Sequence, residues 1–284
     1  MTDTDQIIDA VAHALAVRPT AVTELQGGQI GSVYRVDCAD GSCLVAKTGD
    51  SSLSTEAFML RTLARESELP VPDVRYADDD LLVLEYVPGS TDHDSAVARD
   101  AAAHLAALHD TSADAFGLER ETLTGPVRQP NPWTDSWITF YRDHRLEYVA
   151  SLALQGGTLP AALADRLDAV ADDLESLLVE PDAPALIHGD VWTTNVLSRD
   201  GDVVAFLDPA TYYAHPEIEL AYVDWTETFG DAFFDRYRDY RAIESGFFDR
   251  RRYVYRLYPL LVHTHLFGER YVGQLEATLA QLGY

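Results

Sequence analysis

The sequence predicts an α+β fold with two lobes, a small antiparallel sheet followed by a mainly helical region. Runs of β-forming residues alternate with turn residues between about residues 20 and 87, whereas apolar residues recur at helical spacing over most of the remainder. The dipeptide Pro88-Gly89 separates the two patterns. With 284 residues, 47% of them hydrophobic, the chain can bury two cores. We therefore expect an N-terminal lobe over 1–87 and a C-terminal lobe over 88–284.

The N-terminal lobe is expected to contain two helices and five strands. Apolar spacing predicts a helix over 3–17, and a second helix over 54–65 would begin at Ser54 as its N-cap. The predicted strands cover residues 20–25, 32–38, 42–47, 73–76 and 81–87. The Asp40-Gly41 dipeptide would turn the chain between the second and third strands.

The C-terminal lobe is expected to be built from helices. They are predicted at about 94–109, 132–153, 159–179, 216–228, 231–243 and 247–281. One β-type interruption remains, in which residues 185–187 and 203–207 would form a small hairpin among the helices.

The composition excludes several classes of protein. The chain carries 47 acidic side chains against 21 Lys plus Arg, so its net charge is −26. Such a chain does not bind nucleic acid through general basicity. No apolar run is long enough to span a membrane, and the first twenty residues are acidic rather than basic. We expect a soluble cytoplasmic protein whose dense carboxylates are typical of adaptation to high salt.

Lysine and cysteine usage gives two more clues. Lys47 is the single lysine among the 21 basic residues, which suggests a task that a guanidinium cannot perform. Cys38 and Cys43 flank the Asp-Gly turn and could face each other across a two-residue hairpin. A cytosolic setting favours free thiols over a disulfide.

The segment from His188 to Asn195, reading HGDVWTTN, has the residue types of a phosphoryl-transfer site. A carboxylate such as Asp190 can orient and deprotonate a substrate hydroxyl, while the amide of Asn195 can hold a metal ion that bridges phosphates. Asp208, at the end of the next predicted strand, would be the second ligand of Mg²⁺. Capping residues in an ordinary polar loop would explain any one of these side chains, but not their joint pattern. His188 is expected to brace the loop.

The N-terminal lobe offers matching parts for ATP. The loop residues Gly27, Gly28, Gln29 and Ile30 could fold over phosphates, although glycines between strands are more often a plain turn. Lys47 lies on a strand that reads LVAK, and Glu56 on the following helix could pair with it and aim it at the phosphates. At the end of the strand over 81–87, the backbone of Glu85, Tyr86 and Val87 would meet the adenine.

In this order, these motifs resemble those of the fructosamine kinase (ketosamine-3-kinase) family. The similarity extends over about residues 7 to 281, and three blocks are the most specific: WITFYRDHRL at 137–146, HGDVWTTN at 188–195, and Asp208-Pro209-Ala210 with Tyr212-Tyr213. The resemblance implies a protein-kinase-like fold related to the aminoglycoside phosphotransferases. Glu219 departs from the family pattern, in which Asp is usual at this position.

The resemblance also implies a reaction and roles for individual residues. The family transfers the γ-phosphate of ATP to the 3-hydroxyl of a ketosamine, the adduct of a sugar with an amine, on a small molecule or a glycated protein. Asp190 would then be the catalytic base, Asn195 and Asp208 the Mg²⁺ ligands, and Lys47 with Glu56 the ATP-phosphate pair. Trp192 would lie near the sugar. His263 would be either a core residue or part of the substrate pocket.

Two other functions remain open from the sequence. A kinase of the aminoglycoside or choline type would use the same ATP machinery on another hydroxyl, and the acidic charge would suit its cationic substrate. A nucleotide-binding pseudokinase should have lost one or more of Lys47, Asp190, Asn195 and Asp208, but all four are present.

Overall fold

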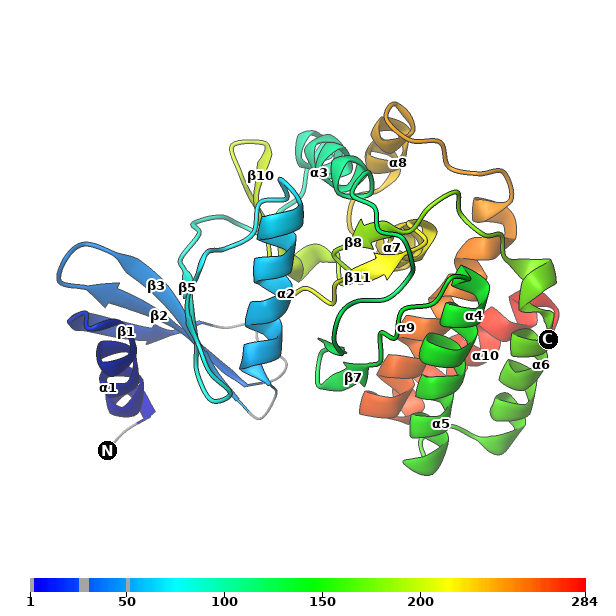
Figure 1. The fold of residues 1–284 in the computed structure, drawn as a ribbon, viewed down its shortest axis with the longest axis horizontal. Helices are drawn as coiled ribbons and strands as arrows, with labels where there is room; N and C mark the ends of the chain where they lie inside the picture. The colour runs from blue at the N-terminus through cyan, green and yellow to red at the C-terminus, as the bar shows by residue number, and fades with distance from the viewer. Residues whose placement is uncertain (1–2, 26–30, 50–51) are drawn as a thin grey trace.

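The computed structural model describes residues 3–25, 31–49 and 52–284 and shows a sheet-containing lobe joined to a helical lobe (Figure 1). The sheet has five strands in the order β1-β2-β3-β5-β4, and every neighbouring pair is antiparallel. Its strands are β1 (Pro19–Glu24), β2 (Ser32–Cys38), β3 (Cys43–Thr48), β4 (Val74–Ala77) and β5 (Leu82–Glu85). The predicted α+β class, with an antiparallel sheet followed by many helices, is confirmed.

One helix packs on each face of this sheet. Helix α1 (Asp3–Leu15) packs Ile7 and Val11 against alternate residues of β2, such as Val36. Helix α2 (Leu53–Glu66) packs its apolar side against Leu82 and neighbouring residues. The prediction of Ser54 as the N-cap was wrong, because α2 begins one residue earlier and Ser52 precedes it. The position of α2 matters for function, since it presents Glu56 towards β3.

Cys38 and Cys43 lie on opposite faces of the sheet. The register pairs Cys43 with Asp37, so Cys43 shares a face with Asp37 while Cys38 points to the α1 side. Both thiols are free, as predicted, and the alternative of a cross-strand disulfide was wrong. The reason is a register offset of one residue, which turns a side chain to the other face of a sheet.

The helical lobe follows from residue 95 onwards. Its helices are α3 (Ser95–Leu108), α4 (Trp137–Tyr141), α5 (Glu147–Gln155), α6 (Ala161–Leu177), α7 (Glu217–Trp225), α8 (Asp231–Arg238), α9 (Arg252–Phe267) and α10 (Glu269–Leu282). Two of the predicted helices are each divided. The one over 132–153 begins only at Trp137 and contains a π-turn over 142–146, and the one over 247–281 breaks at Gly268, where φ is 64°. Glycine adopts this conformation without a Cβ clash.

The short strands of this lobe pair differently from the prediction. Strand β8 (Ala185–Ile187) pairs with β11 (Tyr212–Ala214), and β9 (Val196–Arg199) pairs with β10 (Asp202–Phe206). The predicted hairpin between 185–187 and 203–207 was therefore wrong. The chain turns at Asp200-Gly201, both with positive φ, so β10 returns along β9. A further hairpin, β6 (Thr122–Thr124) with β7 (Val127–Gln129), was not predicted.

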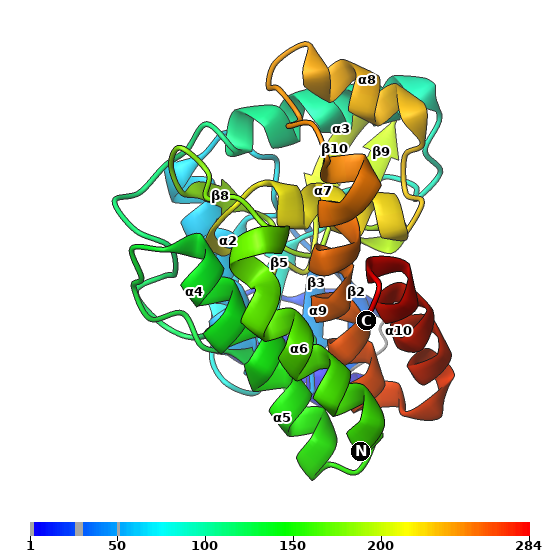
Figure 2. The same ribbon diagram turned by 90° about the vertical axis from the view of Figure 1, so that its right-hand side faces the viewer.

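The core of the helical lobe contains buried residues of every helix from α3 to α10, and within it α5 packs against both α6 and α9 (Figure 2). Trp137 is fully buried there and donates to the Tyr255 hydroxyl at 3.1 Å, so it is a core residue. Trp133 is 51% exposed. Within the described residues, no helix combines the length and the apolar character that crossing a bilayer requires.

Candidate active site

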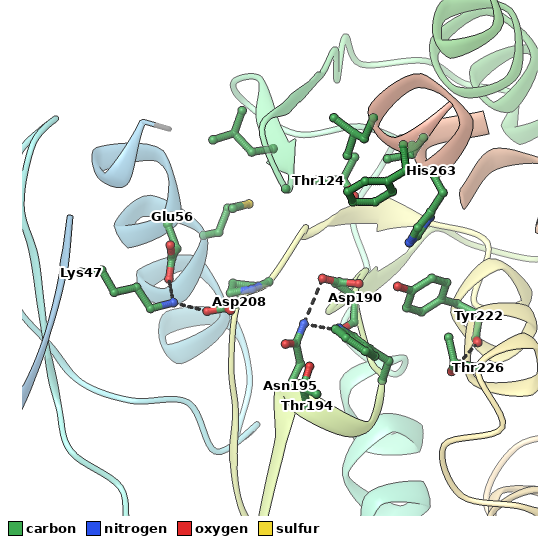
Figure 3. A pocket seen from close by; sticks show the side chains of 18 of the residues that line it. Lys47, Glu56, Thr124, Asp190, Thr194, Asn195, Asp208, Tyr222, Thr226 and His263 are labelled. Atoms are coloured by element: carbon green, nitrogen blue, oxygen red, sulfur yellow. Dashed lines mark hydrogen bonds and ion pairs between the residues drawn. The ribbon is translucent and has the colours of Figure 1, made fainter. Parts of the chain in front are cut away.

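A cavity of about 510 Å³ lies between the sheet and the helical lobe. Residues from β2, β3, α2, the segment after β8, α7, α9 and α10 line it. This arrangement brings together five of the predicted site residues, Lys47, Glu56, Asp190, Asn195 and Asp208 (Figure 3). Trp192 and His263 line the same cavity. Residues far apart in the sequence thus converge on one site.

Lys47 lies on β3 between two carboxylates. Its Nζ donates to Glu56 Oε1 at 2.8 Å and forms a second ion pair with Asp208 (Figure 3). Burial by itself would lower the pKa of Lys47, but the two carboxylates outweigh it and raise the pKa above its usual value. The single lysine is therefore a fixed, charged ammonium at the sheet side of the cavity.

Asp190 sits in a tight loop directly after β8. The preceding Gly189 has a φ of 87°, and a Cβ at that position would lie 2.4 Å from the Ala210 carbonyl oxygen. Only glycine fits there. The backbone N–H of Asp190 donates to His188 Nδ1 at 3.3 Å, which is the bracing contact expected of His188. The loop is thus held rigidly, and Asp190 projects into the cavity.

Glu219 of α7 anchors this loop from below. It accepts hydrogen bonds from the Gly189 N–H at 2.6 Å and the His188 N–H at 3.4 Å, and it contacts His109 Nε2 at 2.9 Å. Burial alone would raise the pKa of Glu219, but hydrogen bonding to His109 contributes most to keeping it below its usual value. The sequence marked Glu219 only as a departure, and His109, which lies 110 residues away, was missed.

The environment of Asp190 suits a proton acceptor. Burial raises its pKa to about 7, although the amide of Asn195 favours the charged form by donating to Asp190 Oδ2 at 2.9 Å. Tyr222 of α7 points its hydroxyl at the same carboxyl group (Figure 3). Burial and the nearby carboxylate raise the pKa of Tyr222 far above its usual value, so it stays a hydroxyl. The sequence did not predict Tyr222 as a site residue, because the residues around it form no motif that indicates a catalytic or binding site.

Asn195 and Asp208 present oxygen atoms of the kind that Mg²⁺ prefers. The side-chain nitrogen of Asn195 is committed to Asp190, which leaves its carbonyl oxygen as a ligand. Asp208 has a φ of 53°, a conformation uncommon outside glycine and frequent at functional sites. Burial by itself would raise the pKa of Asp208, but Lys47 lowers it below its usual value. These two residues fit a metal that takes its other ligands from phosphates and water.

Among the described residues, the predicted adenine-binding residues Glu85, Tyr86 and Val87 do not line the cavity. Gly27, Gly28, Gln29 and Ile30 lie outside the described residues. Glu85, Tyr86 and Val87 follow at the end of β5, where the Tyr86 N–H donates to the Cys43 carbonyl at 3.2 Å. A role for their backbone in binding adenine stays a prediction.

Comparison with known proteins identifies the family. The family profile described as fructosamine kinase matches residues 2–283. The chain belongs to the fructosamine kinase family. A Synechocystis protein named probable ketoamine kinase is 35% identical over 237 residues, which cover 80% of this chain and 77% of that protein. A chloroplastic protein-ribulosamine 3-kinase of Oryza sativa subsp. indica is 32% identical over 275 residues, covering 90% of this chain and 77% of that protein.

Solved structures support membership of the fructosamine kinase family. The crystal structure of a Thermobifida fusca protein named "putative fructosamine-3-kinase" superposes with a TM-score of 0.89 at 30% identity and covers 98% of both chains. An aminoglycoside phosphotransferase in complex with ADP and hygromycin B superposes with a TM-score of 0.68 at 15% identity, over 97% of this chain and 98% of that one. The second likeness shows the shared fold alone.

Proposed function

We propose that this protein is an ATP-dependent ketosamine 3-kinase that phosphorylates the 3-hydroxyl of sugar adducts of amines. The observation that carries the proposal is the convergence of Lys47, Asp190, Asn195 and Asp208 on one cavity in a chain of the fructosamine kinase family. An aminoglycoside or choline kinase is not favoured, because the family profile covers almost the whole chain. A pseudokinase is not favoured either, since the four side chains are present and assembled.

Asp190 acts as the base in this mechanism. Its carboxylate accepts the proton of the substrate 3-hydroxyl while the hydroxyl oxygen attacks the γ-phosphorus of ATP. The bond from phosphorus to the β,γ-bridging oxygen breaks, and ADP leaves. The amide of Asn195 holds the Asp190 carboxylate in place, and Glu219 holds the backbone of the loop. These contacts keep the base fixed, so little reorganisation is needed at the moment of transfer.

Lys47, positioned by Glu56, binds the α- and β-phosphates of ATP. Asn195 and Asp208 would hold Mg²⁺, which neutralises phosphate charge when it is bound. The Lys47–Asp208 ion pair must loosen for this, since Asp208 then shares its charge with the metal. We retain the division into lobes over 1–87 and 88–284, with ATP bound between them.

The product explains what the reaction is for. Carbon 3 is next to the carbonyl at carbon 2, and loss of a proton from carbon 1 gives an enaminol with a double bond between carbons 1 and 2. The electrons of this enaminol expel the phosphate from carbon 3. An imine is left at carbon 1, and its hydrolysis by water frees the amine. We propose that the protein reverses glycation of small molecules or proteins in the cytoplasm.

The test is Mg²⁺-dependent ADP release in high salt with fructosyl, ribulosyl and erythrulosyl amines, and with choline and an aminoglycoside as controls. Turnover of ketosamines alone is the expected result. Turnover of the controls alone would retain the kinase chemistry but refute the substrate. ATP binding without turnover of any compound would favour the pseudokinase.

A further inference from the structure

The hairpin of β6 and β7 brings a threonine hydroxyl to the catalytic cavity. Strand β6 ends at Thr124, directly before the turn into β7. Thr124 lines the main cavity, and it also lines a smaller cavity of about 30 Å³ that Asp190 shares (Figure 3). The Thr124 hydroxyl has no hydrogen-bond partner among the residues that the structure describes. It is therefore available to a ligand bound beside Asp190.

The pleat of the hairpin directs Thr124 towards the smaller cavity. Thr122 and Gln129 lie opposite each other in the register, and both are buried. Because alternate residues of a strand share a face, Thr124 lies on the same face as Thr122. On this face Gln129 Oε1 accepts a hydrogen bond from the Tyr258 hydroxyl at 2.7 Å, and Tyr258 lines the smaller cavity. The face that carries Thr124 is thus the one turned to the cavity beside the catalytic base.

Arg145 holds the start of β7 and, through Asn131, the start of β6. The Arg145 side chain is fully buried, and it donates from Nη2 to Asn131 Oδ1 at 2.6 Å and from Nη1 to the Pro130 carbonyl at 2.9 Å. Asn131 Nδ2 in turn donates to Thr122 Oγ1 at 2.8 Å. Within the described ranges no carboxylate contacts this guanidinium, which lies 3.9 Å from the ring centroid of Tyr212. Burying a cation in this way costs stability, and here it fixes the base of the hairpin.

Hydrogen bonds also join the hairpin to the loop of the catalytic base. Gln129 Nε2 donates to the Ala210 carbonyl at 3.3 Å. The Ala210 N–H donates to the His188 carbonyl at 2.8 Å, two residues before Asp190. The hairpin and the catalytic loop therefore form one hydrogen-bonded unit, which fixes the position of Thr124 relative to Asp190.

The geometry of a ketosamine shows what this hydroxyl can bind. The 3-hydroxyl must reach Asp190 in the proposed reaction, and the 4-hydroxyl is attached to the neighbouring carbon. A cavity of about 30 Å³ has room for a group of the size of one water molecule, such as the hydroxyl on carbon 4. A threonine hydroxyl can both donate and accept, which suits a second hydroxyl as its partner.

Resting on the proposed function, we propose that Thr124 binds the 4-hydroxyl of the ketosamine and selects substrates that carry hydroxyls on both carbon 3 and carbon 4. Arg145 is the positioning residue that holds the hairpin for this contact. A substrate with a methyl group at carbon 4 would cover the Thr124 hydroxyl without giving it a partner. The contact also orients carbon 3 towards Asp190, so its loss should lower kcat as well as raise KM.

The test compares two adducts of the same alkylamine in the same high-salt buffer. The erythrulosyl amine carries both hydroxyls. Its 4-deoxy analogue, a 1-alkylamino-3-hydroxybutan-2-one with the same arrangement at carbon 3, carries only the hydroxyl that is phosphorylated. We expect kcat/KM to be at least about tenfold higher for the erythrulosyl amine, because a site built to bind a hydroxyl rejects a compound that lacks it.

The outcomes separate this inference from the proposed function. Equal kcat/KM for the two compounds would overturn the role of Thr124 and leave the ketosamine kinase intact. Turnover of ribulosyl or fructosyl amines without turnover of the erythrulosyl amine would also overturn it, since hydroxyls beyond carbon 4 would then decide. If the wild-type protein phosphorylates none of these adducts, the proposed function itself fails.

Variants at two threonines locate the selection. Thr124→Val replaces the hydroxyl with a methyl group of the same size and should lower the ratio of kcat/KM for the two compounds at least about fivefold, whereas Thr124→Ser should retain it. Thr226→Val is the matched control, because Thr226 lines the same cavity but already donates its hydroxyl to the Tyr222 carbonyl at 2.9 Å. An unchanged ratio in Thr124→Val, or an equal loss in Thr226→Val, would overturn the assignment.

Arg145→Met tests the positioning role. It should lower the same ratio and leave the KM for ATP unchanged, because the hairpin and not the sheet loses its support. Thr122→Val removes only the Asn131 contact and is the milder variant, which should lower the ratio in the same direction. A ratio within one variant does not depend on the fraction of protein that folds. Lower activity with an unchanged ratio in both variants would show that Arg145 only stabilises the fold.

Discussion

The substitution Asp190→Asn should abolish phosphorylation and at the same time stabilise the fold at neutral pH. The carboxyl group of Asp190 is held at the cavity, where burial raises its pKa to about 7 from an ordinary value of 3.8. A raised pKa means that ionising this carboxyl group costs more free energy in the folded protein than in the unfolded chain. An amide of nearly the same shape has no charge to bury, and its oxygen can still accept from the Asn195 nitrogen, which is 2.9 Å from Asp190 Oδ2.

The size of the effect follows from the pKa shift. A change of about three pKa units corresponds to roughly 4 kcal/mol at about 1.4 kcal/mol per unit, and this is an upper limit. Because the cavity is open to water, we expect a gain of at least about 1 kcal/mol. Below pH 4, Asp190 is protonated in both states and the gain vanishes. Between pH 4 and 7 the unfolded chain ionises first, so the gain grows with pH, and above pH 7 it is constant.

Urea unfolding of both proteins, free of nucleotide and metal, at pH values from 4 to 8.5 in the same high-salt buffer measures this difference. ADP release with a ketosamine measures activity in parallel. A variant that is less stable than wild type at pH 8, or a difference that does not change with pH, would refute the burial argument. Retained turnover would remove Asp190 from the role of base.

Three further substitutions or conditions test the rest of the structure. Lys47→Met should lower kcat/KM for ATP at least a hundredfold. It should also lower the thermal midpoint, because Glu56 and Asp208 are left facing each other without a cation. An unchanged KM and kcat would show that the ammonium does not bind phosphate. Glu217→Ala should lower the free energy of unfolding in urea by about 3–5 kcal/mol. The reason is that the buried Arg251 guanidinium loses its two hydrogen bonds to Glu217, at 2.6 and 2.7 Å. A decrease of less than about 1 kcal/mol would contradict this. Because the net charge is −26, the thermal midpoint should rise steeply between about 0.1 and 1 M KCl as the Debye length falls from about 10 to 3 Å, and equal midpoints would refute adaptation to salt.

The predicted elements that the structure confirms are those with strong local signals. The run of β-forming residues over 32–38 and the turn at Asp40-Gly41 predicted β2, and the structure confirms its bounds. The lysine of β3 and the segment around Asp190 were recognised for a similar reason, because each is a compact run of residue types with a chemical task. Such patterns depend on neighbours within a few residues, and these can be read directly from a sequence.

The errors arose where pairing partners are distant or elements are short. Three residues in β8 and three in β11 are too few to show a period, and the choice between β10 and β11 as the partner of β8 depends on the turn at Asp200-Gly201. The predicted long helices were interrupted by a short π-helix over 142–146 and by the positive φ of Gly268, and apolar spacing alone indicates neither.

The sequence by itself therefore determined the fold class and the family, and it predicted the residues that the structure brings together at the cavity. Only the tertiary structure decided what surrounds them: the contact of Glu219 with His109, the approach of Tyr222 to Asp190, and the aromatic side chains of α7, α9 and α10 that line the cavity. The physical reason is that the chemistry of a reaction restricts the types of residue that can catalyse it, so each motif can be identified in the sequence separately. The shape and charge of a pocket are properties of side chains brought together from many elements, and they exist only once the core has packed.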